Sequence, residues 1–218
     1  GIKITEITGF GLSCKYGSGS SLGQPLGVKS VGFIEVASSA GVTGIGETYA
    51  GVYAPELVAP IVDFLRRLII GKPVCEVSEI SETLRHIPFI GRNGLIRSIA
   101  SAIDIALWDL AGKLLEKPVY ALFAENPRSD MPVYASGGSA AVDAATIKSE
   151  LDGLIDEGHK AFKMRVGYQS WASDLKRVAA ARKRLGPERD LMVDAIMGTL
   201  TPPWTSETAI ARAQDLED

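Results

Sequence analysis

Cysteine and histidine are scarce in this chain of 218 residues, which contains two of each. Cys14 and Cys75 lie far apart and lack the short spacings of zinc ligands, which excludes a multi-disulfide framework and argues against a zinc site. We expect both to be buried free thiols in a reducing cytoplasm. His86 and His159 belong to no catalytic pattern, and we expect them to be ordinary surface residues.

Long apolar runs and a strong excess of one charge are also missing. No run reaches the roughly 20 residues that a membrane span needs, and the N-terminus lacks the basic start and apolar segment of a signal peptide. The net charge of −3 gives no reason to expect a nucleic acid or an acidic membrane as partner. Hydrophobic residues make up 46% and charged residues 22%, which is typical of a globular protein. The composition predicts a cytoplasmic protein with no nucleic-acid partner and no membrane partner.

Three segments near the N-terminus have the alternating pattern of β-strands, and short connections favour an antiparallel meander. These segments are residues 2–14, 29–38 and 42–49. Between the first two, residues 15–28 form a long loop rich in glycine and serine. Loops of this length in compact domains are often lids or binding loops, and the alternative is a plain surface loop.

The pattern then changes to the three- and four-residue steps of amphipathic helices, which we expect over residues 55–70, 76–88 and 93–115. In the first helix we expect a buried face made of Leu57, Ile61, Phe64, Leu65 and Leu68. The third helix gives the strongest local signal in the chain. Its apolar stripe consists of Ile96, Ile99, Ile103, Leu107, Leu110 and Leu114.

Two acidic residues of the third helix, Asp104 and Asp109, lie off this stripe. We expect them on a solvated face, paired with Arg97 or Lys113, rather than in a ligand site.

Beyond a polar linker at residues 116–130, short strands alternate with helices. We expect strands over 132–136, 160–166 and 190–194, and helices over 142–157, 172–185 and 205–216. This order is typical of βα units with a parallel sheet, in which the loops after the strands carry the chemistry. We therefore expect a domain over residues 1–130 and a second over residues 131–218.

Charged residues interrupt two of these strands. Lys163 and Arg165 fall on one face of their strand, whereas Phe162, Met164 and Val166 fall on the other. Two cations on one face of an apolar strand are costly unless an anion lies opposite. Asp194 ends the next strand. If the two strands are parallel neighbours, these charges meet at one edge, which predicts a site for an anionic substrate and a metal ion.

In order, these elements resemble those of the enolase superfamily, in the branch of mandelate racemase and muconate lactonizing enzyme. The segments that carry the resemblance are Ala106–Lys113, Lys117–Tyr120, Pro132–Gly137, Phe162–Gly167 and Val193–Ala195. The resemblance implies an α+β capping domain followed by a partial α/β domain, the first three βα units of a modified TIM barrel. It also implies a homo-oligomer.

The same resemblance implies a Mg²⁺ cofactor, with Asp194 as its first ligand. Lys163 and Arg165 match the paired basic residues that act on the proton alpha to the carboxylate of a small-molecule substrate. Four residues match the capping loops that close over the substrate: Ser18, Ser20, Tyr49 and Tyr53. The function implied is a sugar-acid or hydroxy-acid dehydratase, with a racemase, epimerase or cycloisomerase, or a non-catalytic relative, as alternatives.

Two positions depart from the family pattern. Arg165 stands where relatives often have the base lysine, and an arginine keeps its proton at any working pH. The base would then be Lys163 or a histidine on a later strand, and Arg165 a carboxylate clamp. Ile196 stands where relatives often have asparagine. Because only three βα units are expected here, we expect the other metal ligands and any His–Asp base beyond residue 218.

Overall fold

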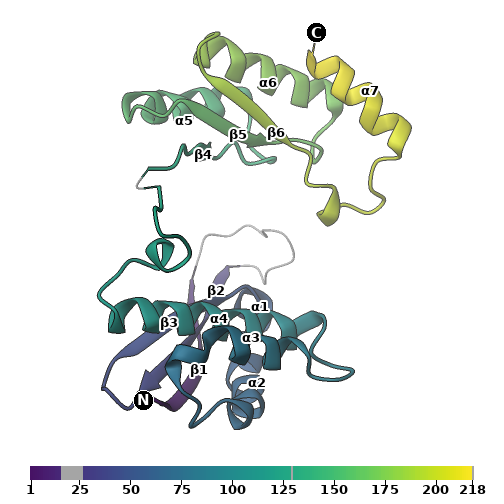
Figure 1. Cartoon of the computed structure of the whole chain (residues 1–218). Helices are drawn as coiled ribbons and strands as arrows, with labels where there is room; N and C mark the ends of the chain where they lie inside the picture. The colour runs from purple at the N-terminus through teal and green to yellow at the C-terminus, as the bar shows by residue number, and fades with distance from the viewer. Residues whose placement is uncertain (16–26, 129, 218) are drawn as a thin grey trace. The chain divides into compact units, whose positions relative to one another are not determined.

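The computed structural model describes residues 1–15, 27–128 and 130–217. The chain divides into two compact units, Gly1–Pro127 and Arg128–Asp218 (Figure 1). Each unit has its own hydrophobic core.

The first unit is built on an antiparallel sheet of three strands in the order β1-β2-β3 (Figure 1). The strands are β1 (Ile4–Lys15), β2 (Val28–Ser38) and β3 (Thr43–Thr48). Antiparallel pairing of β1 with β2, with one register shift between Ile4 and Glu6, and of β2 with β3 confirms the predicted meander. Most of the predicted loop over 15–28, with Ser18 and Ser20, lies outside the described residues.

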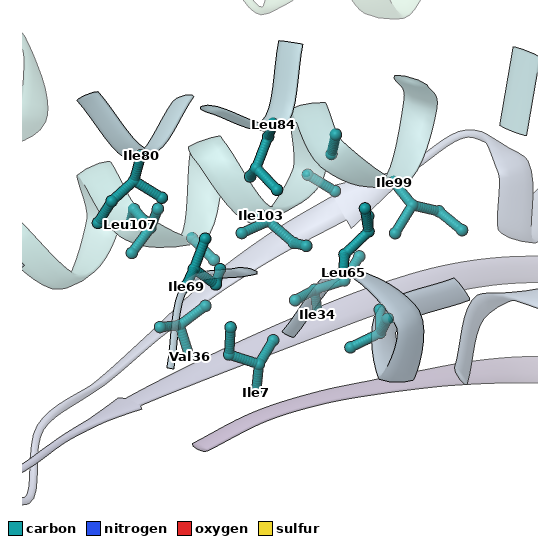
Figure 2. Close-up of a cluster of buried hydrophobic side chains, with 14 of the residues drawn as sticks. Ile7, Ile34, Val36, Leu65, Ile69, Ile80, Leu84, Ile99, Ile103 and Leu107 are labelled. Carbon is teal, nitrogen blue, oxygen red and sulfur yellow. The ribbon is translucent and has the colours of Figure 1, made fainter. Parts of the chain in front are cut away.

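Helices cover one face of this sheet. They are α1 (Ala50–Tyr53), η1 (Pro55–Leu57), α2 (Val58–Leu65), η2 (Arg66–Leu68), η3 (Val74–Glu76), α3 (Val77–Arg85), α4 (Gly94–Leu114) and η4 (Val119–Leu122). The predicted helix over 93–115 is confirmed as α4, and Ile99, Ile103, Leu107 and Leu110 of its predicted stripe are fully buried. Figure 2 shows three of these side chains meeting residues of β1, β2, α2 and α3 in the core.

The predicted helix over 55–70 is wrong in two respects. It is divided into η1, α2 and η2. Of the predicted face, Leu65 is buried and Ile61 is partly buried against the core, but the other buried residues are Val58, Val62 and Ile69. Leu57, Phe64 and Leu68 are about 40% exposed. The apolar residues of this segment lie on several of its sides, so their spacing alone does not decide which stripe faces the sheet.

One polar prediction for this unit is confirmed, and two differ from what the structure shows. Asp109 pairs with Lys113 (2.7 Å) as predicted and also accepts a hydrogen bond from the Ile45 N–H (2.8 Å), whereas Asp104 accepts one from the Ser81 hydroxyl. Cys14 and Cys75 are free thiols, but both are exposed rather than buried. A thiol is small enough to lie on either side of a strand or turn, and next to Cys75 it is Val74 that is buried.

The second unit contains a parallel sheet in the order β4-β5-β6, which confirms the predicted βα units (Figure 1). Its elements are β4 (Ala135–Ser136), α5 (Ala144–Asp156), β5 (Ala161–Arg165), α6 (Trp171–Leu185), β6 (Asp190–Asp194), η5 (Met197–Thr199) and α7 (Ser206–Glu217). Strand β4 is shorter than predicted because ladder pairing begins only at Ala135, three residues after Pro132, which has no N–H to donate. Ile147, Leu151, Phe162, Met164 and Ala181 form a separate core.

Across the described residues, none of the helices combines the length and the apolar character that a membrane crossing requires.

We predict that Gly46→Ala destabilises the first unit. Helix α4 lies so close to β3 that a Cβ at Gly46 would overlap the Ala102 carbonyl oxygen, which is backbone and cannot move aside. We expect a loss of about 3 kcal/mol, near the upper end for overpacking, measured by urea unfolding. The control is Gly153→Ala in α5, where a Cβ meets nothing within 4 Å. It should raise stability by about 0.5–1 kcal/mol, and equal effects of the two changes would contradict the close packing.

We predict that Asp143 contributes an acid-sensitive part of the stability of the second unit. At the N-terminus of α5 its carboxylate accepts hydrogen bonds from the N–H and the hydroxyl of Thr146 (2.8 and 2.7 Å), and these hold its pKa below the ordinary 3.8. A lowered carboxyl pKa gives stability that is present above pH 3.8 and is lost as pH falls through the folded-state value. Asp143→Asn keeps the cap. Between about pH 5 and pH 2, the melting temperature of this variant should fall by less than that of the parent. Parallel pH profiles would contradict this assignment.

Candidate active site

The three charged residues singled out in the sequence come together at the carboxyl ends of β5 and β6. The strands pair in parallel, and the register places Arg165 opposite Asp194. Phe162, Met164 and Val166 are buried on one face of β5, whereas Lys163 and Arg165 are half-buried on the other. The predicted division of this strand into an apolar and a cationic face is confirmed.

Lys163 and Asp194 form an ion pair. The Lys163 Nζ donates to Asp194 Oδ2 at 3.2 Å, and the side chains are 16% and 43% exposed. The other oxygen, Oδ1, accepts a hydrogen bond from the Ile196 N–H (3.0 Å). This backbone hydrogen bond lowers the pKa of Asp194 most, followed by the hydrogen bond from Lys163 and the positive charges of Lys163 and Arg165, while burial opposes the shift. Asp194 is therefore an ionised carboxylate at neutral pH, held from two sides.

The loops that follow β5 and β6 pack against each other beside this pair. A Cβ at Gly167 would meet the Met197 side chain at 2.7 Å and the Ala195 carbonyl oxygen at 2.9 Å. Farther along, Arg212 of α7 stacks on the rings of Trp171 and Trp204, 5.0 and 4.1 Å from the ring centres. Through these contacts, the loops after β5 and β6 lie side by side at the carboxyl ends of the two strands. The sequence did not predict them, because the three residues lie on separate elements.

A carboxylate oxygen is the ligand type that Mg²⁺ prefers, and Asp194 is ionised and partly exposed, so it fits as one ligand. Within residues 1–15, 27–128 and 130–217, no three His, Cys, Asp or Glu side chains lie close enough to hold a metal ion. The donor set at this edge therefore fits a single protein ligand to a magnesium ion.

The other residues singled out in the sequence lie away from this edge. Tyr49 and Tyr53 flank and end α1 in the first unit, with ring centres 5.6 Å apart in an edge-to-face arrangement, and a hydrogen bond to Tyr49 raises the pKa of Tyr53. The two residues are 64% and 46% exposed. His86 follows α3 and pairs with Glu82 (3.1 Å), and His159 pairs with Glu157 (3.4 Å) at the opposite end of β5 from Arg165.

Sequence reasoning missed a buried ion pair on α6. Asp174 and Arg177 are 0% and 1% exposed, and Arg177 Nη1 donates to Asp174 Oδ1 at 2.6 Å. Arg177 also donates to the Arg165 carbonyl oxygen (3.1 Å), and the Gly167 N–H donates to Asp174 Oδ2 (2.8 Å). Charges three residues apart on a helix usually lie on its solvated side, so the sequence alone gave no signal of burial.

We predict that the backbone at Ile196 is strained. Ile196 follows the site carboxylate with φ at 39°, in the left-handed region that a β-branched residue rarely adopts. Ile196→Asn and Ile196→Ala both remove the branched side chain, but asparagine tolerates this conformation better. The Asn variant should be more stable than the Ala variant by about 1 kcal/mol, measured by urea unfolding. An Ala variant as stable as the Asn variant would show that no strain is stored here.

Comparison with known proteins gives matches over most of the chain. Residues 24–124 match the N-terminal domain family of mandelate racemase and muconate lactonizing enzyme, and residues 146–218 match the enolase C-terminal domain-like family. The 3,6-anhydro-alpha-L-galactonate cycloisomerase of Streptomyces coelicolor is 35% identical over 185 residues, 84% of this chain and 50% of that protein. The L-rhamnonate dehydratase of Saccharopolyspora erythraea is 32% identical over 194 residues, 88% of this chain and 47% of that protein.

A solved structure has the same fold. The crystal structure of a racemase from Streptomyces coelicolor with bound magnesium has a TM-score of 0.83 and 31% sequence identity, covering 98% of this chain and 59% of that one. The chain spans about half the length of the curated relatives it matches. From the family matches to both parts and the likeness to solved structures, the chain belongs to the enolase superfamily, in the mandelate racemase and muconate lactonizing enzyme branch.

Proposed function

We propose that this protein is a magnesium-dependent enzyme that removes the proton alpha to the carboxylate of a sugar acid, and that the overall reaction is a dehydration. The observation that carries the proposal is the meeting of Lys163, Arg165 and Asp194 at one edge, with Lys163 Nζ 3.2 Å from Asp194 Oδ2. The dehydratase and cycloisomerase relatives support a sugar-acid substrate.

The reaction explains the residue types at this edge. Removal of a proton alpha to a carboxylate leaves an enolate with two negative charges, which fixed positive charge beside the substrate stabilises. Arg165 keeps its proton, and its planar guanidinium can donate two parallel hydrogen bonds to a carboxylate. We assign Arg165 to holding the substrate carboxylate. Lys163 either adds a second positive charge beside the substrate or takes the alpha proton itself.

When bound, Mg²⁺ supplies a further positive charge to the substrate oxygens. Asp194 would be one of its ligands, held in place by the Ile196 N–H. Because no three possible ligand side chains cluster among the described residues, we place the remaining ligands, and a His–Asp base if one is used, outside them. In the first unit, we assign Tyr49, Tyr53 and the loop with Ser18 and Ser20 to contacts that select the substrate. We also propose a cytoplasmic homo-oligomer.

A cycloisomerase, racemase or epimerase of sugar acids is the second candidate, and the cycloisomerase relative at 35% identity favours it. All candidate enzymes share the first proton transfer and differ in the second step. Dehydration expels the hydroxyl on the neighbouring carbon and yields a 2-keto-3-deoxy acid, whereas racemisation or epimerisation returns a proton to the other face. A non-catalytic relative would do neither.

The test is a panel of aldonic and anhydroaldonic acids incubated with the full-length protein and Mg²⁺ in D₂O. Proton NMR follows the loss of the alpha-proton signal, and mass spectrometry detects the loss of water. We expect exchange together with loss of water. Exchange of the alpha proton without loss of water would favour the second candidate. The absence of exchange with every acid would contradict both candidates.

Variants at the site distinguish the role of the Arg165 cation from that of the Asp194 carboxylate. We predict that Arg165→Met slows alpha-proton exchange at least about 100-fold, as loss of a donor to a developing anion does, and leaves Mg²⁺ affinity nearly unchanged. Asp194→Asn should weaken Mg²⁺ binding by about 10-fold or more, measured by isothermal titration calorimetry. The control is Lys160→Met, an exposed cation just before the amino end of β5. If Arg165→Met exchanges the alpha proton as fast as Lys160→Met, the role of this strand is wrong.

A further inference from the structure

We propose that Arg177, together with Asp174, is a positioning residue that fixes the main chain carrying Lys163 and Arg165. This inference rests on the function proposed above. Neither residue lies among the charges of the site, and both are almost completely buried. They would act through the backbone of the strand that carries the cations.

The ion pair stands where the sheet ladder between β4 and β5 ends. The Gly137 N–H donates to the Lys163 carbonyl oxygen (3.0 Å), and carbonyls two residues apart on a strand point the same way, so the Arg165 carbonyl oxygen also faces β4. At Gly138, with φ at 53°, the chain of β4 turns away. The Arg165 carbonyl oxygen then receives its hydrogen bond from Arg177, and the Gly167 N–H donates to Asp174. The pair therefore binds the two backbone groups beside Val166, the Arg165 carbonyl and the Gly167 N–H, which β4 no longer reaches.

Arg177 also holds the loop that follows β4. Its Nη2 donates to the carbonyl oxygens of Ser139 (2.6 Å) and Gly138 (3.4 Å), and the Arg165 N–H donates to the same Gly138 carbonyl oxygen (3.0 Å). From the other side, Glu150 of α5 accepts a hydrogen bond from the Gly138 N–H (3.0 Å). One guanidinium thus links the ends of two neighbouring strands, with the backbone of Arg165 bound on both its N–H and its carbonyl.

Stability alone does not explain this arrangement. Replacing a buried ion pair by apolar residues of similar volume often leaves stability unchanged or raises it. Apolar residues, however, could not bind three carbonyl oxygens and an N–H at the ends of β4 and β5. The contribution specific to the pair is therefore geometric, and the geometry it fixes is that of Arg165 and Lys163.

The experiment uses four variants of the full-length protein with Mg²⁺ and the sugar acid that the parent turns over best. Arg177→Lys keeps a charge beside Asp174 but loses the fork that reaches several carbonyls. Asp174→Leu combined with Arg177→Met removes the pair without leaving a lone buried charge. Arg184→Lys is the matched control, because Arg184 lies on the same helix, is partly exposed and pairs with Asp152, away from the strand ends. Asp174→Asn shows the effect of leaving Arg177 without its partner.

Two readouts separate positioning from folding. The first is kcat and KM per folded molecule, with unfolding midpoints measured in parallel. The second is hydrogen exchange of the peptides covering 135–143 and 161–168, which needs no substrate. We expect Arg177→Lys and the double variant to lose about 100-fold in kcat, the size of effect that a displacement of about 1 Å can cause. KM should rise because Arg165 holds the substrate carboxylate, Mg²⁺ affinity should change by less than about threefold, and exchange in both peptides should be faster than in Arg184→Lys.

Recovery of the parent kcat in a stably folded double variant would overturn the proposal, because the pair would then serve stability alone. Unchanged hydrogen exchange in both peptides would overturn it as well. If the parent turns over no acid, the proposed function fails, and the exchange measurement still decides whether the pair fixes the strand ends.

Discussion

The parallel pairing of β5 with β6 is the constraint on which the candidate site depends. Because the register sets Arg165 opposite Asp194, the carboxylate meets two cations at one edge of the sheet. A shift by one residue would turn Lys163 and Arg165 into the core and bring Phe162 and Met164 out. The burial of the apolar face therefore fixes the register, and the register in turn fixes the charges. The alternation of this strand thus sets both which side chains are buried and which charges lie at the edge.

The first unit depends on a different constraint, the close approach of backbone to backbone. Gly44 and Gly46 of β3 leave no side chain between the strand and α4, so the helix lies directly on the sheet. The apolar side chains of α4 then reach residues of β1, β2 and α3 (Figure 2). Each unit has its own core, so the segment with Tyr49 and Tyr53 is supported independently of the charged edge.

Sequence reasoning succeeded where one periodicity dominated and failed where several elements had to meet. The alternation from Phe162 to Val166 and the stripe of α4 each have one apolar side, so strand, helix and buried face followed directly. The segment of α2 is apolar on several sides, and of the face chosen there Leu65 is buried, whereas Leu57, Phe64 and Leu68 are exposed. Asp174 and Arg177 were missed because their partners are backbone groups at strand ends, and such contacts leave no trace in residue spacing. The distance between Lys163 Nζ and Asp194 Oδ2 likewise could not be obtained from the sequence.

The hydrogen bonds that anchor β5 have a consequence for how the site could change over evolutionary time. They engage the N–H and carbonyl of residue 165 rather than its side chain. Any amino acid except proline offers the same two groups, so the anchoring is indifferent to which side chain stands at this position. Exchange of the arginine for a lysine or a neutral residue would change the charge at this edge while both backbone hydrogen bonds stayed available. A superfamily in which relatives carry out different reactions on one fold is the outcome expected when chemistry and support are separated in this way.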